Sequence, residues 1–425
     1  PSCPPPDSPV SRCGIDRVNA ASGDRINALD LIRGIAVLGI LAVNITGFAG
    51  PLAATITPNW NGPTSFADQA AFAGMMVLFE GKMRALFTLL FGASMLLFVE
   101  RADAAGRSGE ALQMRRLGWL ALIGYLHFAL LWWGDILFTY ALAGLTALSL
   151  RAMPVKTMVL AALLIFTAWN GWGMANSVPP ILAEARVVAG MAPPAEANRV
   201  QAEAAKDQAE NRASLARTQA GFLPQVQYKQ VRKGGFPLVE AFYSMGETLP
   251  LMLLGMALYL TGFFTGAWPR ARLVTMAWGG IGGGGVVTVL LTALAWQRQF
   301  PPRLMEGLLG YWLALPHLAM AMGYAAALML AAPRLLNWRL GQRIQAAGRM
   351  ALTNYLGTSL LMTGLFYGWG LGLGGKVPDR WLGLFVLLGW VAMLAASKPW
   401  LARFRQGPLE WAWRSLTEWR RLPLR

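Results

Sequence analysis

Two histidines are the side chains of this sequence best suited to proton transfer. His127 lies in GYLHFALLWWGDILFTY, and His317 follows Pro316 in another apolar run. Histidine works as a general acid or base near neutrality, and a buried histidine needs a partner that fixes its tautomer. Asp135 follows His127 at a predicted tight external turn. His127 is therefore a candidate general acid or base, although a histidine satisfied by a neighbouring helix would give the same pattern.

The motif EGKMR places three charges directly before the apolar run LFTLLFGASMLLF. Glu80, Lys82 and Arg84 could form a solvated helix cap or an anion-binding collar, and Glu80 can pair with Arg84 at spacing i, i+4. His127 and His317 both come close to mid-membrane, and Glu247 reaches a similar predicted depth. The two histidines and Glu247 could line one buried site or a proton path, or serve as hydrogen bonds that hold helices together.

The first apolar run, LDLIRGIAVLGILAVN, carries a third group of polar residues. Asp30 and Arg33 are spaced i, i+3, and Asn44 follows Arg33 by three helical turns, so all three share one helix face. They could bind a substrate, or form an anchoring ion pair and a packing amide. With two histidines, and with both cysteines near the N-terminus, the sequence offers no clear metal site.

The composition requires a membrane around these residues. Hydrophobic residues make up 55% of the chain, charged residues 14%, and the mean hydropathy is +0.43, which leaves too little polar surface for a soluble domain. The net charge of +16 does not indicate nucleic-acid binding, because the cations punctuate apolar runs instead of covering one polar face. The expected partner is the lipid bilayer.

A transmembrane helix needs about 20 mostly apolar residues, and this rule predicts an all-α polytopic bundle of about ten helices. The predicted spans are 29–48, 83–99, 117–133, 135–151, 156–174, 238–264, 273–296, 307–331, 350–368 and 380–397. The segment 66–81 is a short helix candidate that could be interfacial, re-entrant or an eleventh span. The glycine-rich run at 279–287 has no preceding strand, so it predicts close helix packing and not a phosphate loop.

Lysine and arginine give the bundle an orientation, since they concentrate on cytoplasmic flanks. No lysine or arginine occurs between Arg33 and Lys82, which suits an external first loop. Both termini are then cytoplasmic, in a bacterial cytoplasmic (inner) membrane. The predicted divisions are a disordered tail at 1–24, membrane helices at 25–174, a polar extracytoplasmic helical loop at 175–237, membrane helices at 238–397 and a basic tail at 398–425.

Five motifs in order resemble the YeiB-like bacterial membrane proteins, a family defined by a domain of unknown function. They are RINALDLIRGIAVLGILAVNI, EGKMRALFTLLFGAS, HFALLWWGDILFTYALAGL, GRMALTNYLGTSLLMTGLFYGWGLGLGG and GPLEWAWRSLT. The fourth motif adds Asn354 to the candidate binding residues. The resemblance covers residues 25 to 417.

That family is similar to transmembrane acyltransferases, including heparan-glucosaminide N-acetyltransferase and bacterial enzymes that acylate extracytoplasmic sugars. Arg33 matches an arginine of the first helix, and Asn44 stands where the sugar O-acyltransferases have a histidine. The heparan enzyme pairs arginine with asparagine here and has its histidine in the next external loop, before a stretch similar to Trp60, Asn61 and Gly62. This chain has no histidine in that loop.

The resemblance implies transfer of an acyl group from a cytoplasmic thioester, such as acyl-coenzyme A, to an extracytoplasmic sugar or lipid-linked acceptor. His127 would then be the base in place of the loop histidine, with Asp135 or Glu80 as the orienting acid. Arg33, Lys82 and Arg84 would contact the anionic donor. A proton-coupled transporter that uses the histidines and Glu247 is the second hypothesis. A non-catalytic membrane partner protein is the third.

Overall fold

The structure is a computed structural model that describes residues 9–425, with side chains from Asn27 onward. The first half contains α1 (Pro9–Ala49), α2 (Leu52–Ile56), α3 (Phe66–Leu78), α4 (Lys82–Ala104), α5 (Gly109–Leu130), α6 (Leu137–Ser149), α7 (Val155–Val188), α8 (Pro194–Thr218) and α9 (Phe222–Lys233). The second half contains α10 (Phe236–Leu260), α11 (Arg270–Gln297), α12 (Pro302–Gly307), the π-helix η1 (Leu308–Trp312), α13 (Ala314–Leu335), α14 (Arg339–Arg349), α15 (Ala351–Phe366), α16 (Asp379–Arg403) and α17 (Pro408–Thr417). These elements confirm the predicted all-α bundle.

Seven segments of the described chain are long and apolar enough to cross a membrane. They are α1 from Asn27, α3 together with α4, α7, α10, α11, α13 and α16. Of the other predicted spans, α6 has 13 residues and α15 has 16, which gives lengths of about 20 and 24 Å against a hydrocarbon core of about 30 Å. α5, with 22 residues, is long enough to cross a membrane, but it is not apolar enough to count among the seven segments. The protein is therefore a polytopic membrane protein in which α6 and α15 are shorter than the hydrocarbon core is thick.

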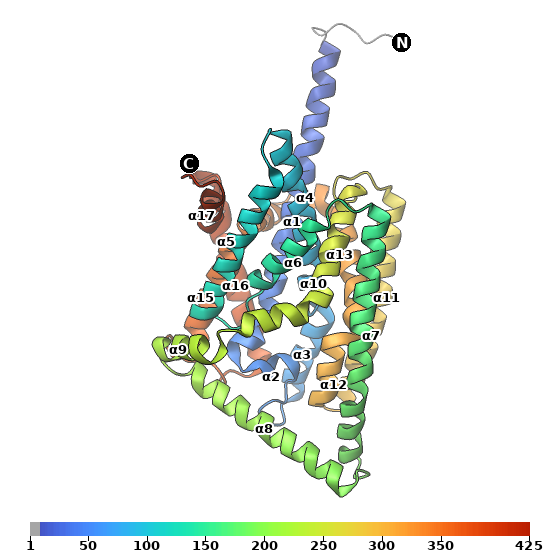
Figure 1. Cartoon of the computed structure of the whole chain (residues 1–425), viewed down its shortest axis with the longest axis vertical. Coiled ribbons are helices and arrows are strands. Elements are labelled where there is room, and N and C mark those ends of the chain that lie inside the picture. Colours follow the sequence, from blue (N-terminus) through green and yellow to red (C-terminus); the bar gives the residue numbers. More distant parts are fainter. Residues whose placement is uncertain (1–8) are drawn as a thin grey trace.

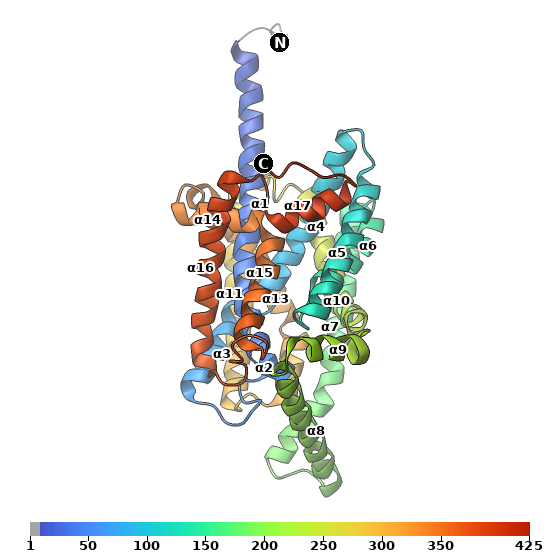
Figure 2. The ribbon, with the colours of Figure 1, turned by 90° about the vertical axis from the view of Figure 1, so that its left-hand side faces the viewer.

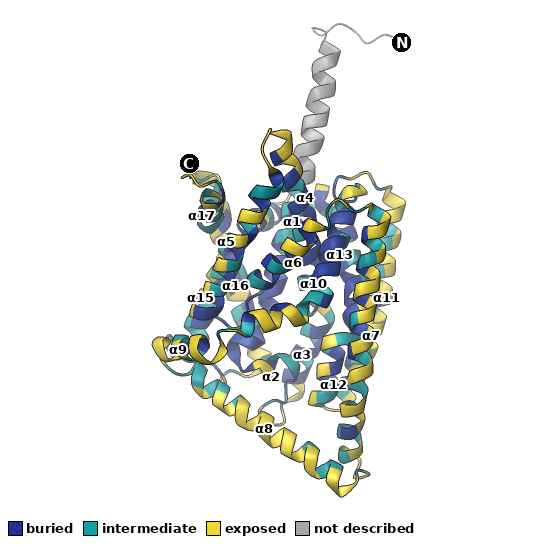
Figure 3. Ribbon diagram, viewed as in Figure 1, coloured by how far each residue is buried: buried dark blue, intermediate teal, exposed yellow. Residues whose placement is uncertain are grey.

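The long helices run side by side and leave two different ends (Figures 1 and 2). We call the end at which α1 enters the bundle, and across which α17 lies, the terminal end. We call the opposite end, where α8 runs from the far end of α7 back toward α9, the α8 end. Exposed residues cover α8 and the outward sides of α7 and α11, whereas buried residues fill the centre (Figure 3).

Glycines set the closest helix contacts in the bundle. A Cβ atom at Gly92 of α4 would lie 2.1 Å from the Met252 carbonyl oxygen of α10, and one at Gly255 would lie 2.0 Å from the Leu89 oxygen. In the glycine-rich run, a Cβ atom at Gly280 would lie 2.3 Å from the Ala319 oxygen of α13. Small residues let membrane helices approach backbone to backbone, and the predicted packing role of the 279–287 run is confirmed.

Three predicted boundaries differ from the helices observed. α1 begins at Pro9, so residues 9–24 continue the first helix, while residues 1–8 of the predicted disordered tail lie outside the described residues. α7 runs through the predicted boundary at 174/175 to Val188, because Pro179 and Pro180 are accommodated within the helix. In the predicted 398–425 tail, α16 continues to Arg403 and α17 follows. Helix extension is favourable once a buried segment has nucleated it.

Candidate functional site

A break between α3 and α4 places the EGKMR motif inside the bundle. α3 ends at Leu78, α4 begins at Lys82, and Gly81 between them has a φ of 72°. The Lys82 side chain is fully buried, and its Nζ donates to the Met76 carbonyl oxygen at 2.6 Å. The last carbonyl groups of a helix have no intrahelical partner. Lys82 therefore caps α3 across the break, and the ambiguous segment 66–81 is the first half of a broken membrane helix.

Arg84 pairs across the bundle and not with Glu80. Its Nη2 donates to Glu247 Oε2 of α10 at 2.8 Å, with 37% of the Arg84 side chain exposed and 16% of Glu247. The predicted pairing of Glu80 with Arg84 assumed one continuous helix. Because α4 begins only at Lys82, Glu80 lies outside the helix and the i, i+4 geometry does not apply.

His317 lies against the same break. The residue is 5% exposed, and its Nε2 atom is buried without a hydrogen-bond partner among the described residues. A Cβ atom on Gly81 would lie 1.9 Å from His317 Nδ1. The structure thus gathers Glu80, Arg84, Glu247 and His317 around one glycine, as the common predicted depth of Glu247 and His317 suggested. His127, which the sequence placed at the same depth, is paired elsewhere with Asp135, and no hydrogen bond or ion pair joins it to this group within residues 27–425.

His127 and Asp135 form a buried pair that closes the turn between α5 and α6. His127 Nδ1 lies 2.8 Å from Asp135 Oδ1, and the two side chains are 0% and 2% exposed. The second carboxylate oxygen of Asp135 accepts the backbone N–H of Phe138 at 2.8 Å, at the start of α6. The sequence predicts an external turn here. In the structure the turn borders the α8 end, and the His127 and Asp135 side chains are buried in it and do not face solvent.

The pair fixes the protonation of the imidazole. A carboxylate can only accept a hydrogen bond, so Nδ1 is the donor of this contact, and in the neutral imidazole Nε2 then presents its lone pair. Nε2 is buried and has no partner among the described residues. Tyr355 and Trp132 border the ring, with centroids 5.2 and 6.5 Å from that of His127. This arrangement is chemically that of a general base oriented by an acid.

The remaining candidates make structural contacts. Arg33 donates to Asp30 Oδ1 at 2.7 Å and to the Ser94 hydroxyl of α4 at 2.8 Å, so the predicted ion pair of the first helix is present. Asn354 donates to the Ala347 carbonyl oxygen and to the Ser397 hydroxyl, both at 3.0 Å. Asn44 is half-buried, and no side-chain hydrogen bond to it is found in the described part of the chain.

Sequence reasoning missed the tyrosines that connect these groups. The hydroxyl groups of Tyr140 and Thr88 lie 2.6 Å apart, and the Tyr140 hydroxyl also donates to the Arg84 carbonyl oxygen at 3.3 Å. Tyr140 therefore joins α6, which starts beside Asp135, to α4 at the break. Tyr140 and Tyr355 both lie within the motifs quoted above. A buried tyrosine hydroxyl usually needs a hydrogen-bond partner, and this rule could have pointed to both residues.

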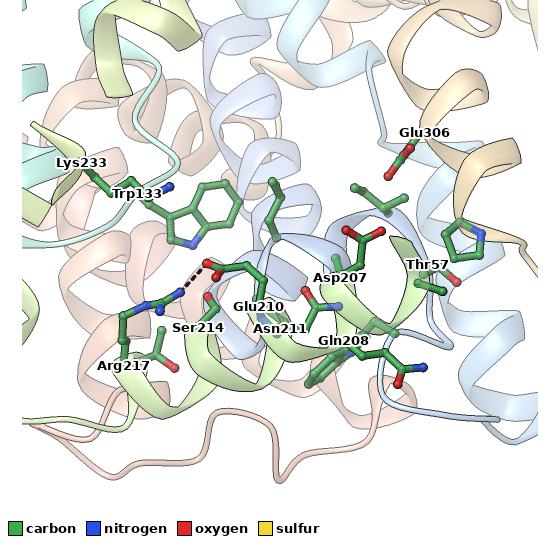
Figure 4. Close-up of a pocket in the computed structure, with 18 of the residues that line it drawn as sticks. Thr57, Trp133, Asp207, Gln208, Glu210, Asn211, Ser214, Arg217, Lys233 and Glu306 are labelled. Carbon is green, nitrogen blue, oxygen red and sulfur yellow. Dashed lines mark hydrogen bonds and ion pairs between the residues drawn. The ribbon is translucent and has the colours of Figure 1, made fainter. Parts of the chain in front are cut away.

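A cavity of about 500 Å³ lies at the α8 end. This chamber is bounded by α2, the loop that carries Trp60, the end of α5, the turn residue Trp133, and α8 and α9 (Figure 4). Phe128, which follows His127, and Trp133, which follows Trp132, both line it. The His127–Asp135 turn is therefore directly behind one wall of the chamber.

Lys229 of α9 ties the chamber to that turn. It is 9% exposed, and its Nζ donates to the Leu131 carbonyl oxygen at 3.0 Å, while the Leu131 N–H donates to the His127 carbonyl oxygen at 2.9 Å. No salt bridge to Lys229 is found in the described chain. Burial without a counter-charge lowers the pKa of Lys229 to about 8.

This lowered pKa predicts a dependence of stability on pH. Between about pH 8 and 10.5 the unfolded chain holds the Lys229 proton more tightly than the folded chain, so the contribution of Lys229 to stability rises with pH in this window. Relative to Lys229→Met, the wild-type protein should gain roughly 1–3 kcal/mol between pH 7.5 and 10. Unfolding in detergent at several pH values measures the difference, and Lys206→Met, on the exposed α8, is the control. A difference that falls with pH would contradict the assignment.

Fold and site together define a polytopic helical membrane protein with a buried histidine–aspartate pair and a broken membrane helix. A family model described as "Protein of unknown function (DUF418)" matches residues 258–420. The chain is 31% identical over 403 residues to "Uncharacterized protein YeiB" of Escherichia coli (strain K12), covering 93% of this chain and 96% of that protein. The chain belongs to the YeiB-like family.

A second relative extends the family to another bacterium. "Uncharacterized protein YxaH" of Bacillus subtilis (strain 168) is 29% identical over 404 residues, covering 93% of this chain and 95% of that protein. No solved structure matches the chain. The predicted resemblance to YeiB-like proteins is thus confirmed over nearly the whole chain.

Proposed function

We propose that the protein is a membrane acyltransferase in which His127 is the general base and Asp135 orients it. The observation that supports this function best is the buried Nδ1–Asp135 contact of 2.8 Å, which leaves the lone pair of Nε2 without a protein partner. An oriented imidazole beside a ligand-sized chamber suits removal of a proton from an acceptor hydroxyl group.

In the proposed reaction the acceptor hydroxyl attacks the carbonyl carbon of an acyl thioester. A new C–O bond forms and the C–S bond breaks, so the acyl group becomes an ester and the donor leaves as a thiolate. His127 Nε2 takes the hydroxyl proton and returns it to the thiolate sulfur. Asp135 stays ionised and stabilises the transient imidazolium.

The donor and acceptor would approach from opposite ends of the bundle. The cations of the cytoplasmic flanks assign the terminal end to the cytoplasm and the α8 end, with its chamber, to the outside. A bacterial cytoplasmic membrane agrees with the bacterial relatives. Arg33 and Lys82 are engaged within the protein, whereas Arg84 keeps 37% of its side chain exposed. Arg84 is therefore our candidate contact for the anionic donor, for which acetyl-coenzyme A is a suitable probe.

The test uses the full chain in vesicles that contain bacterial membrane lipids and lipid-linked sugars. Labelled acetyl-coenzyme A is supplied on one side, and release of free thiol and label in the acceptor fraction are followed. His127→Ala should lower the transfer rate by about 10²–10⁴-fold. His317→Ala is the matched comparison, because His317 is also a buried histidine with an unpartnered Nε2 but has no carboxylate partner. Equal rates for wild type and His127→Ala would remove His127 from the mechanism.

A proton-coupled transporter is the second candidate, and the broken helix favours it. Interrupted membrane helices with ionisable groups at the break occur at transport sites, and here Arg84, Glu247 and His317 surround Gly81. A transporter would move protons into vesicles with no acyl donor present. In that case His317→Ala and Glu247→Gln would abolish the flux and His127→Ala would not, which is the reverse of the result expected for acyl transfer.

A further inference from the structure

The chamber at the α8 end has two walls of different chemistry. Apolar and aromatic side chains form the wall on the side of the membrane bundle, among them Trp60, Trp133 and Phe236. α8 forms the opposite wall and presents Gln208, Asn211 and Ser214 (Figure 4). A ligand that fills this space needs one flat apolar face and hydrogen-bonding groups on the other side.

Seven of the eight charged side chains that line the chamber are engaged with the protein. The eighth, Lys233, is exposed, and no ion pair or hydrogen bond to it is found among the described residues. Arg217 donates to Glu210 at 2.6 Å, and Arg303 donates to Asp207 at 2.8 Å and to Glu306 at 2.9 Å. Four carboxylates and four cationic side chains line the space, so their formal charges cancel. A cationic ligand would have to break one of these pairs or remain unpaired. An anionic ligand would find only the exposed Lys233, where solvent weakens the attraction.

Two more of the lining charges hold backbone groups. The Glu184 carboxylate accepts the N–H groups of Arg303 and Leu304 at the start of α12, at 3.1 and 3.3 Å. Lys229 donates to the Leu131 carbonyl oxygen. By contrast, the side chains of Gln208, Asn211 and Ser214 make no hydrogen bond to other described residues. Apart from the exposed Lys233, the free hydrogen-bonding capacity of the chamber is therefore neutral, with amide and hydroxyl donors and acceptors.

We propose that this chamber binds a neutral polyhydroxylated ring compound, a saccharide without ionised substituents. The C–H face of the ring would lie on the aromatic wall at Trp133, and its hydroxyl groups would bond to the amides of Gln208 and Asn211. Binding of this kind needs no acyl donor, so the proposal stands apart from the proposed function. Where acyl transfer occurs, the same chamber holds its acceptor beside the His127–Asp135 turn.

The test measures direct binding by calorimetry to the full chain in a zwitterionic detergent without a sugar headgroup. Neutral probes are glucose, trehalose and sucrose, and the charged analogues are glucuronate and glucosamine. The neutral sugars should bind, and the charged analogues should bind at least about tenfold more weakly, since an unpaired charge costs 1.4 kcal/mol or more. No binding of any neutral sugar up to about 100 mM, or tighter binding of the charged analogues, would overturn the proposal.

Matched variants locate the binding. Gln208→Ala should weaken binding about fivefold or more, whereas Gln201→Ala, which changes an exposed glutamine of the same helix outside the chamber, should not change it.

On the aromatic wall, Trp133→Ala should weaken sugar binding about tenfold. Trp278→Ala is the control, since Trp278 lies on α11 with 77% of its surface exposed. Because the measurement contains no acyl donor, its outcome does not depend on whether transfer occurs. Equal effects of the chamber and control variants would show that the sugar binds elsewhere.

Discussion

Gly81→Ala is expected to destabilise the folded protein by about 2–5 kcal/mol. A residue other than glycine in the left-handed region costs about 1–2 kcal/mol, and Gly81 has a φ of 72°. The new methyl group would also lie 1.9 Å from His317 Nδ1, and forcing a side chain out of a packed interior costs about 1–3 kcal/mol more. Unfolding of the purified protein in mixed micelles measures the change.

Two further variants separate the two causes. In Gly81→Ala/His317→Ala the imidazole is gone, so the share of the destabilisation that comes from the steric clash should disappear. The share that comes from the backbone conformation of residue 81 should remain. Gly74→Ala in α3 is the control. A Cβ atom at Gly74 meets nothing within 4 Å, so this change should be neutral or slightly stabilising, as alanine favours a helix. Equal stability of Gly81→Ala and Gly74→Ala would refute the break as described.

Asp135→Ala is expected to destabilise the protein by about 3–5 kcal/mol, the usual cost of removing one partner of a buried pair. The substitution leaves His127 Nδ1–H without its acceptor and also removes the oxygen that accepts the Phe138 N–H at the start of α6. Asp135→Asn keeps one accepting oxygen and so can satisfy only one of the two donors, which should make it less costly than Asp135→Ala. The measurement is again unfolding in mixed micelles, and it does not depend on any enzymatic activity.

A double-mutant cycle tests whether the two residues act together. The loss in His127→Ala/Asp135→Ala should be smaller than the sum of the single losses by about 1–3 kcal/mol. Glu110→Ala is the control for a removed carboxylate, because Glu110 is 45% exposed and pairs with Arg151 near the surface. The stability lost in Glu110→Ala should not exceed about 1 kcal/mol. Additive losses for His127 and Asp135 would mean that the contact contributes nothing to folding.

Local sequence spacing predicted those contacts that lie within one continuous helix. Asp30 and Arg33 are one turn apart on α1, and they pair. The same reasoning failed for Glu80 and Arg84, because Gly81 interrupts the helix between them and Arg84 turns to Glu247 instead. Spacing could not reveal this interruption, since a glycine before an apolar run fits a continuous helix as well as a broken one.

Depth counted along the predicted spans was a partial guide to the site. It grouped His127, His317 and Glu247, and the structure brings His317 and Glu247 to the break but pairs His127 with Asp135 elsewhere. It put Asp135 at an external turn, but it did not indicate that the turn is covered by α9 and that both side chains of the pair are buried. Hydropathy does not distinguish a short helix that ends inside the bundle from one that spans the membrane, because both are equally apolar.

By itself the sequence determined that this protein is a polytopic helical membrane protein of the YeiB-like family, and that His127 and Asp135 are a candidate pair. Apolar content and helical period are properties of the chain, and lipid requires every backbone group within it to be satisfied by helices. Only the tertiary structure decided that Arg84 pairs with Glu247, that Lys82 caps α3 and that His317 lies against Gly81. Those contacts depend on the rotation and ends of neighbouring helices, which packing between distant segments fixes and local pattern does not.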